Sequence, residues 1–267
     1  VRLAERISGD STVGHALAFC QAVESAEGVT IPARASYVRA VLLELERLYN
    51  HIADVGMIVS DTGFAVAHAH CSRIRERLLR LNHAVTGNRL LRGSVIPGGV
   101  GCDLPAARRP PGAAAAEHPV DVASEVDEAV RDFLDIVSIC ASHSLVMDRL
   151  ESTGVLNTTI ARDHAVRGYV ARASGLDVDA RRDHPRPPYD ELRVEVPVLD
   201  SGDVRARFLV RVAEVRASAA LIRRAVETIP DGSLAAPMRD IPPRVPAFAI
   251  VEGWRGAIVH WVMGDDN

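Results

Sequence analysis

A short segment near the N-terminus gathers side chains that are capable of chemistry. Glu5 and Arg6 are followed by two serines, Ser8 and Ser11, and then by His15 in a helical stretch. A serine hydroxyl stays neutral and is a hard, weak metal ligand, whereas a cysteine thiol ionises near about pH 8.5 and gives a soft thiolate. The serines therefore favour hydrogen bonds at the start of a helix, with Ser11 as its N-cap.

Two further pairs of titratable side chains lie three residues apart in the longest helical pattern. His51 precedes Asp54, and Glu44 precedes Arg47. Residues at this spacing share one face of a helix, so each pair can form an ion pair or hydrogen bond. An ordinary ion-pair network and a proton relay both remain open for them.

The other histidines and the arginines give weaker signals. His68 and His70 are two apart on a predicted helix, so their side chains diverge by about 200 degrees and cannot chelate one metal together. Positive charge gathers on and after that helix, where it forms either a solvated face or a docking surface for an acidic partner. The arginines concerned are Arg73, Arg75, Arg77, Arg80, Arg89 and Arg92.

Three amphipathic stretches predict the helices that must position these groups. The first covers residues 11–27. The second begins after Pro32, has apolar residues every three or four positions and ends near Gly63 after about eight turns. The third runs from Phe64 to about Val85 and stops at Gly87-Asn88, a favourable helix C-cap signal. Short connections between them predict an antiparallel bundle.

The rest of the chain predicts one more bundle helix and a mixed portion. Residues 97–119 are rich in Gly, Pro and Ala and predict a surface connection, and a helix over 120–150 closes the bundle. Alternation predicts a strand over 192–198, followed by a helix over 204–228. Two strands, 248–252 and 257–262, flank a turn at 253–256.

Composition narrows the class of protein. The chain has 267 residues, 48% of them hydrophobic, enough for one large core or two modest ones. A net charge of -4 argues against general nucleic-acid binding. Four scattered cysteines without a C-x-x-C pair indicate a reducing compartment, and the sequence shows neither a membrane span nor a signal peptide. The glycine-rich stretches at 97–101 and 253–256 do not form a nucleotide-binding motif.

These patterns together predict a mainly α fold, a multi-helix bundle with a small α+β portion. Residues 1–150 are expected to form a four-helix bundle core, and residues 151–267 an α+β portion with C-terminal strands. One continuous domain is the alternative. Because the helical motif starts almost at Val1, we also expect the sequence to be part of a longer gene product.

The segment 5–15 resembles the first metal-binding motif of NiFe-hydrogenase large subunits, E-R-x-C-G-x-C-x3-H, with Ser8 and Ser11 at the two cysteine positions. Further segments, in collinear order, resemble the superfamily shared by membrane-bound hydrogenases of the formate hydrogenlyase type and the 49 kDa-type core subunit of respiratory complex I. They include 32–35, 43–52, 61–63, 86–89, 98–105, 171–175, 202–207 and the E-x-x-R-G turn at 252–256.

The resemblance implies which residues would form a site. Ser8 and Ser11 occupy degenerate nickel-ligand positions beside Arg6, an electrostatic anchor, and the family's second C-x-x-C pair does not occur in this sequence. The complex I relatives also lack these cysteines, and their altered site is part of a quinone pocket. Asp61 matches an acidic residue of that pocket, and with His15 it would be the proton-handling pair. The quinone-binding tyrosine, however, corresponds to Gly9.

The resemblance also implies a function and partners. The chain is expected to be a subunit of a membrane-associated hydrogenase or NADH:quinone oxidoreductase-type complex that has lost the NiFe centre. It would bind no metal or cofactor itself, with quinone as a candidate acceptor and iron-sulfur clusters in a partner small subunit. Membrane subunits would hold it on the cytoplasmic face of the cell membrane. A catalytically silent structural or assembly paralogue is the alternative, and an active NiFe hydrogenase ranks third.

Overall fold

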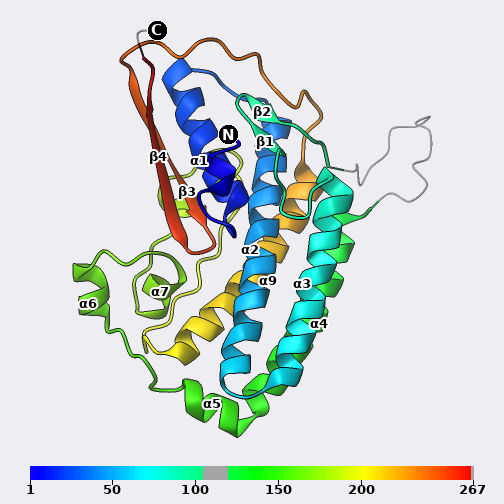
Figure 1. The fold of residues 1–267 in the computed structure, drawn as a ribbon, viewed down its shortest axis with the longest axis vertical. Helices are drawn as coiled ribbons and strands as arrows, with labels where there is room; N and C mark the ends of the chain where they lie inside the picture. Colours follow the sequence, from blue (N-terminus) through cyan, green and yellow to red (C-terminus); the bar gives the residue numbers. More distant parts are fainter. Residues whose placement is uncertain (105–119, 266–267) are drawn as a thin grey trace.

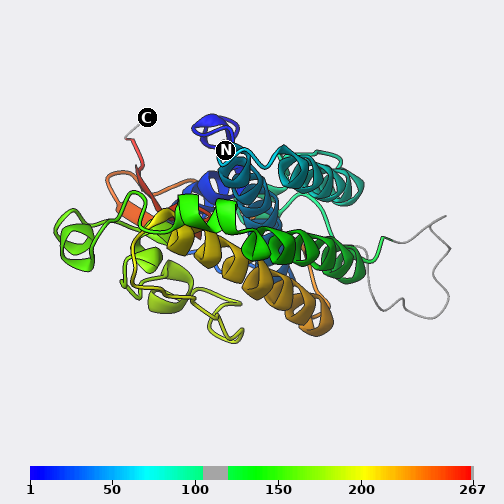
Figure 2. The same ribbon diagram turned by 90° about the horizontal axis from the view of Figure 1, so that it is seen from below.

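Four long helices form an elongated bundle in the computed structural model, which describes residues 1–104 and 120–265. They are α2 (Ala33–Asp61), α3 (Ala65–Thr86), α4 (Val122–Ser142) and α9 (Val204–Thr228). α2 packs against both α3 and α9, and α4 completes the bundle by packing against the same two helices (Figures 1 and 2). This arrangement confirms the mainly α fold.

The central helix α2 is buried on almost every side over its first two thirds. Pro32 precedes it with extended backbone, so the missing proline N–H costs no hydrogen bond at the helix start. Leu42, Leu45 and Leu48 are fully buried. A helix that is buried on so many sides needs neighbours all round, and α3, α9 and the N-terminal segment supply them.

Glycine ends two of the predicted helices, as expected for Gly87. Gly28 and Gly87 adopt left-handed backbone with φ of 75° and 74°, and their N–H groups bond to carbonyls in the last turns of α1 (Thr12–Glu27) and α3. Only glycine takes this conformation at little cost. The three predicted helices at the N-terminal end therefore exist with nearly the predicted bounds.

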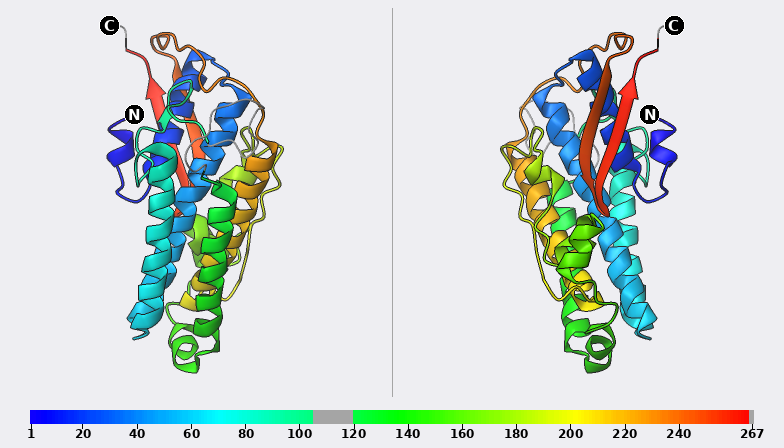
Figure 3. Two further views of the ribbon diagram at one scale, coloured as in Figure 1. Left: turned by 90° about the vertical axis from the view of Figure 1, so that its right-hand side faces the viewer. Right: turned by 90° about the vertical axis from the view of Figure 1, so that its left-hand side faces the viewer.

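The prediction that α1 belongs to the bundle was wrong, and α9 occupies that place. α1 instead packs against a hairpin of β3 (Pro246–Gly253) and β4 (Gly256–Met263), in antiparallel register with Phe248 opposite Trp261. At Gly14 a Cβ would lie 2.7 Å from Ile258 Cδ1, so the helix and β4 approach too closely for a side chain. The bundle thus draws helices from both sides of residue 150 (Figure 3).

Two other local predictions were also wrong. The helix predicted over 120–150 breaks at His143, whose extended backbone separates α4 from α5 (Ser144–Leu150) while its ring packs on Phe64. The hydroxyl of Ser142 bonds back to the Ile139 carbonyl, which competes with continued helix. Residues 192–198 form no strand, because in the described part of the chain no other segment pairs with them.

Several short elements complete the described structure. The surface connection predicted at 97–119 begins within a hairpin of two short strands, and residues 105–119 lie outside the described residues. The short elements are η1 (Ala4–Arg6), β1 (Val95–Ile96), β2 (Gly99–Val100), α6 (Thr158–Asp163), α7 (Gly168–Ala173) and α8 (Ala180–Asp183).

No helix among residues 1–104 and 120–265 has the length and apolar character to cross a membrane.

Candidate functional site

The loop before α1 is organised by Asp10, a residue that the sequence did not single out. The hydroxyls of Ser8 and Ser11 both donate to Asp10 Oδ1, at 2.6 and 3.2 Å. Ser11 occupies the N-cap position as predicted, but its side chain does not cap the helix. The two serines therefore fold the loop inward onto a carboxylate.

Asp10 also fastens this loop to the turn of the β3–β4 hairpin. The guanidinium of Arg255 pairs with Asp10 Oδ2 and stacks over the Trp254 ring. The Asp10 carbonyl accepts from Trp254 Nε1 at 3.0 Å and from Asn50 Nδ2 at 2.7 Å. Partial burial would raise the pKa of Asp10, but hydrogen bonds from Ser8 and Arg255 hold it below its ordinary value. The negative charge of Asp10 thus holds the loop to the hairpin turn through Arg255.

The start of α1 is capped from another helix. Glu46 of α2 is buried, and its oxygens accept from the N–H groups of Val13 and Gly14 at 2.6 and 3.0 Å. Burial raises the pKa of Glu46 to about 8, although these N–H groups favour the ionised form. Sequence reasoning missed this residue because the cap lies 32 residues away along the chain.

His15 lies in the first turns of α1 and contacts the hairpin. Its Nδ1 is 3.1 Å from Nε2 of His260 on β4, and both rings are partly buried. Burial lowers the pKa of each imidazole. Neutral rings favour one N–H···N hydrogen bond between α1 and β4, so His15 helps to position this end of the hairpin.

The structure does not bring all the predicted site residues together. Arg6 is exposed, and Asp61 is exposed at the last residue of α2. Eleven residues separate Asp61 from Asn50, which contacts Asp10, so helix geometry places Asp61 about 16 Å further along the axis. The predicted pairing of His15 with Asp61 is therefore not formed, because the length of α2 holds them apart (Figure 1).

The donor groups at the loop do not fit a nickel–iron centre. The two serine hydroxyls are engaged with Asp10, and a neutral hydroxyl is a poor ligand for these metals. Among the described residues no group of three or more His, Cys, Asp or Glu side chains has the geometry to hold a metal ion. Burial raises the pKa of the Cys20 and Cys71 thiols to about 12, so neither is a ready thiolate.

A buried ionic network lies directly behind the loop and fixes the hairpin turn. Arg47 of α2 donates to the carbonyls of Glu252 and Gly253 at 2.6 and 3.1 Å. The same guanidinium lies 3.3 Å from Glu44, as the sequence predicted, and 3.4 Å from Glu214 of α9. The network therefore joins α2, α9 and the hairpin at one point.

The prediction that His51 pairs with Asp54 was wrong. His51 Nε2 bonds to Glu214 Oε2 at 2.7 Å, and Asp54 pairs with Arg211 on α9. Burial lowers the pKa of His51, while Arg172 and His51 overcome burial and hold the pKa of Glu214 well below its ordinary value. His51 and Asp54 each bind a residue of α9 instead of each other because α9 packs against the face of α2 that carries these side chains.

The network continues through the segment that crosses the hairpin. Arg172 binds Glu214 at 2.7 Å and Glu252 at 2.9 Å, and Arg181 binds Asp179 and Glu44. All these groups are buried, and together they comprise four carboxyl groups and three guanidiniums besides His51. The carboxyl groups are Glu44, Asp179, Glu214 and Glu252, and the guanidiniums are those of Arg47, Arg172 and Arg181.

Burial and neighbouring charges together shift the pKa values of the carboxyl groups in this network. Burial and the neighbouring Asp179 raise the pKa of Glu252, whereas the Arg181 guanidinium overcomes burial and holds the pKa of Asp179 at about 2. A network of paired charges is tolerated inside a protein, but loss of one partner leaves an unbalanced buried charge. Arg47 of this network holds the turn that contacts Asp10, and a proton relay through the network stays a prediction.

The arginine-rich helix face is largely neutralised within the molecule. Arg77 pairs with Glu125 and Glu128 of α4, and Arg89 pairs with Glu76. These pairs bridge exposed surfaces of α3, α4 and the loop after α3. A docking role for this face stays a prediction.

Comparison with known proteins places the chain in a family. Residues 61–266 match the family described as respiratory-chain NADH dehydrogenase, 49 Kd subunit. The chain belongs to this family. The matched residues of this chain include the bundle from the end of α2 onward and the whole β3–β4 hairpin.

Full-length similarity extends the match to the N-terminal loop. An NADH-quinone oxidoreductase subunit from Dehalococcoides mccartyi is 30% identical over 261 residues, which cover 96% of this chain and 68% of the relative. Formate hydrogenlyase subunit 5 of Escherichia coli is 31% identical over 265 residues, covering 99% of this chain and 45% of the relative. This chain of the 49 Kd subunit family thus spans about two thirds of one relative and less than half of the other.

A solved structure has the same fold. A chain of the membrane-bound sulfane sulfur reductase, an archaeal respiratory membrane complex, superposes with a TM-score of 0.79 and 27% sequence identity. The superposition covers 95% of this chain and 67% of that one. The bundle with its attached hairpin is therefore shared with a member of a respiratory membrane complex.

Proposed function

We propose that this chain is a subunit of a membrane-associated electron-transfer complex of the NADH:quinone oxidoreductase and hydrogenase type. Its relatives of similar sequence are subunits of an NADH-quinone oxidoreductase and of formate hydrogenlyase, and its structural neighbour belongs to a respiratory membrane complex. Partners of the proposed subunit are an iron-sulfur small subunit and membrane subunits. Those partners would attach it to the cytoplasmic face of the membrane.

One observation carries this proposal: the loop 8–11, at the degenerate metal-ligand positions, is a connected set of polar contacts. Asp10 gathers Ser8, Ser11 and Arg255, and the turn carrying Arg255 is held by the buried Arg47. A scaffold without any function at this position could replace these groups by apolar packing. The presence of these polar contacts supports a working surface for electron transfer or partner docking.

The same loop supports loss of the NiFe centre. Its oxygen donors are already engaged with one another, and oxygen ligands do not replace soft thiolates at nickel. Electron transfer through the proposed complex would then use an organic acceptor, with quinone as the candidate. His15 at the loop and Asp61 at the far end of α2 would act separately, as orienting or proton-handling groups.

A silent structural or assembly paralogue is the second candidate. It is favoured by the separation of His15 from Asp61 and by the position of the cavities. The cavities of about 450 and 330 Å³ both lie beside β3, and neither is lined by Ser8, Ser11 or His15. In this alternative the subunit would contribute contacts to its complex and no chemistry.

Copurification tests the proposal. The full-length gene product would be tagged in its native cell, extracted in mild detergent and purified with its partners, which mass spectrometry identifies. We expect an iron-sulfur small subunit and polytopic membrane proteins in stoichiometric amounts. Recovery of the protein alone from the soluble fraction would contradict the proposal, and stoichiometric nickel would contradict loss of the metal centre.

A variant separates a role of the loop from general stability. Asp10→Ala removes the group that holds the loop to the hairpin turn, whereas Asp135→Ala changes an exposed carboxylate on α4. We expect Asp10→Ala to weaken recovery of the small subunit and Asp135→Ala to leave it unchanged. If the purified complex of the parent protein reduces quinone, the electron-transfer function is favoured over the silent paralogue.

A further inference from the structure

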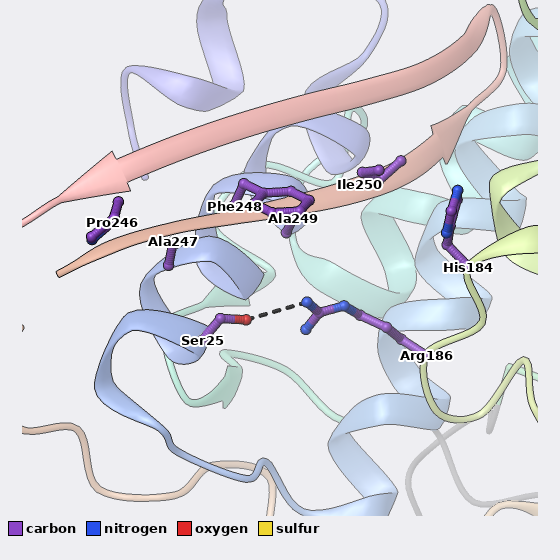
Figure 4. A pocket seen from close by; sticks show the side chains of 8 residues that line it. All are labelled: Ser25, His184, Arg186, Pro246, Ala247, Phe248, Ala249 and Ile250. Carbon is purple, nitrogen blue, oxygen red and sulfur yellow. Dashed lines mark hydrogen bonds between the residues drawn. The ribbon is translucent and has the colours of Figure 1, made fainter.

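The β3–β4 hairpin leaves one edge of β3 without a strand partner in the described structure. Its sheet contains only these two strands, and β4 pairs with β3 along the other edge. A groove of about 450 Å³ follows this free edge, lined by the consecutive residues 246–250 on one side and by Ser25, His184 and Arg186 on the other (Figure 4). A groove lined by consecutive strand residues presents the strand's backbone, not one face of it.

A second cavity extends the groove toward the hairpin turn. It has a volume of about 330 Å³, and Ile250 and His184 line both cavities. Further along, Glu252 and Gly168 line the second one. The second cavity is also lined by Ala257 and Val259 of β4, so it lies over one face of the hairpin. The groove along the β3 backbone therefore spans residues 246–250, enough for about five residues of extended chain at about 3.3 Å each.

The outer face of the same hairpin carries exposed apolar side chains. Phe248, Val259, Trp261 and Met263 have exposed fractions of 60, 59, 62 and 51%. Phe248 and Trp261 stand opposite each other in the register. Nearer the turn, residues 167–168 and 178–184 lie beside this face, where Ile250, Glu252, Ala257 and Val259 line the second cavity. A strand added at β3 would place alternate side chains beside Phe248 and continue this apolar face.

Arg186 lies along the groove, and the second cavity is lined by Arg167 together with the carboxyl groups of Asp179, Asp183 and Glu252. Arg186 is exposed, and its side chain bonds only to Ser25 Oγ, at 3.2 Å, among the described residues. Arg167 is likewise exposed beside the second cavity, and within residues 1–104 and 120–265 it bonds only to the Val166 carbonyl. Asp183, the exposed carboxylate of that cavity, is already paired with Arg182. Both guanidiniums are thus available to carboxylates of an incoming segment.

We propose that the free edge of β3 binds an extended segment of a partner protein, which adds as a strand and carries acidic side chains for Arg186 and Arg167. Main-chain hydrogen bonds would supply affinity, and the two arginines with the apolar face would select the sequence. The proposal deepens the proposed function, on which it rests for the existence of a protein partner. Its chemistry commits to a protein strand, not to a small ligand.

A synthetic peptide tests this directly on the purified full chain. The probe is a short labelled peptide in which valine alternates with threonine or glutamate, and binding is followed by fluorescence anisotropy. One matched peptide carries N-methyl groups on its backbone amides, which removes its donors, and another carries lysine in place of glutamate. We expect the first peptide to bind, with slowed amide exchange at alternate residues of 247–251, and the other two to bind at least roughly tenfold more weakly.

Charge reversal in the protein identifies the groove. Arg186→Glu should weaken binding of the acidic peptide by roughly tenfold and strengthen binding of the lysine peptide. Arg131→Glu, at an exposed site on α4, should change the affinity for neither peptide. Equal binding of the N-methylated peptide, or no binding of any peptide, would overturn the proposal. So would protection of the same amides by self-association of the chain, because the occupant would then be a second copy. None of these failures alters the copurification result on which the proposed function depends.

Discussion

Replacement of Glu46 by glutamine tests whether the carboxyl group that caps α1 holds a proton in the folded protein. Burial raises the pKa of this group from 4.5 to about 8, against the opposing effect of two backbone N–H donors. In the unfolded chain the same carboxyl has its ordinary pKa. At a pH between these two pKa values, folding therefore takes up a proton, which makes the free energy of unfolding depend on pH.

The sign and magnitude follow from the two pKa values. The stabilisation linked to this proton is fully present below about pH 4.5 and is lost as the pH rises toward 8. At about 1.4 kcal/mol per pH unit, the interval corresponds to about 5 kcal/mol of unfolding free energy. Glutamine does not titrate, so Glu46→Gln removes this dependence. Its amide nitrogen would face a backbone N–H, which costs about 1–3 kcal/mol at every pH.

Urea denaturation followed by circular dichroism between pH 5 and pH 8 measures the effect. We expect Glu46→Gln to be less stable than the parent at pH 5 and more stable at pH 8, so that the two stability curves cross. Glu227→Gln, at an exposed position of α9, controls for the loss of one carboxylate elsewhere and should follow the parent. Parallel curves for Glu46→Gln and the parent would show that Glu46 is ionised throughout, and would refute the reasoning.

Three further predictions concern the contacts around this site. Asp10→Ala frees the loop 8–11 from the hairpin turn, and we expect a loss of about 1–3 kcal/mol with faster amide exchange in the loop; unchanged exchange would contradict the role given to this carboxylate. Glu214→Ala leaves buried cations unpaired and should cost about 3–5 kcal/mol by chemical denaturation, whereas a cost below about 1 kcal/mol would show that the network readjusts. Gly14→Ala places a Cβ against Ile258 and should destabilise the protein by about 1–3 kcal/mol, and the additional change Ile258→Ala should recover part of that loss in a double-mutant cycle.

Local sequence signals predicted the helices well. The periodic apolar residues after Pro32, the glycines that end α1 and α3, and the two alternating stretches near the C-terminus each act within a few residues along the chain. Such signals depend on backbone sterics and on one hydrophobic face, so they are legible without any tertiary contact. The break at His143 escaped because both sides of it carry the same apolar stripe and only the Ser142 side chain competes with the helix.

Motif resemblance located the loop of the candidate site but not its internal chemistry. The spacing of Ser8, Ser11 and His15 pointed to this segment, whose role as a site stays a prediction, and the comparisons confirmed the family. Asp10 lay between the serines without attracting notice, because nothing local indicates that it binds Arg255, a residue 245 positions away. The roles proposed for His15 and Asp61 stay predictions.

The sequence by itself determined where the long helices lie and which superfamily the chain resembles, because these properties depend on residue type and short-range spacing. Only the tertiary structure decided that α9 and not α1 completes the bundle, that Glu46 caps α1, and that His51 pairs with Glu214 instead of Asp54. Several amphipathic helices can satisfy one apolar face, and buried charges accept any partner of opposite sign. The choice among them is made by packing of the whole chain, which brings distant residues together and removes water from them.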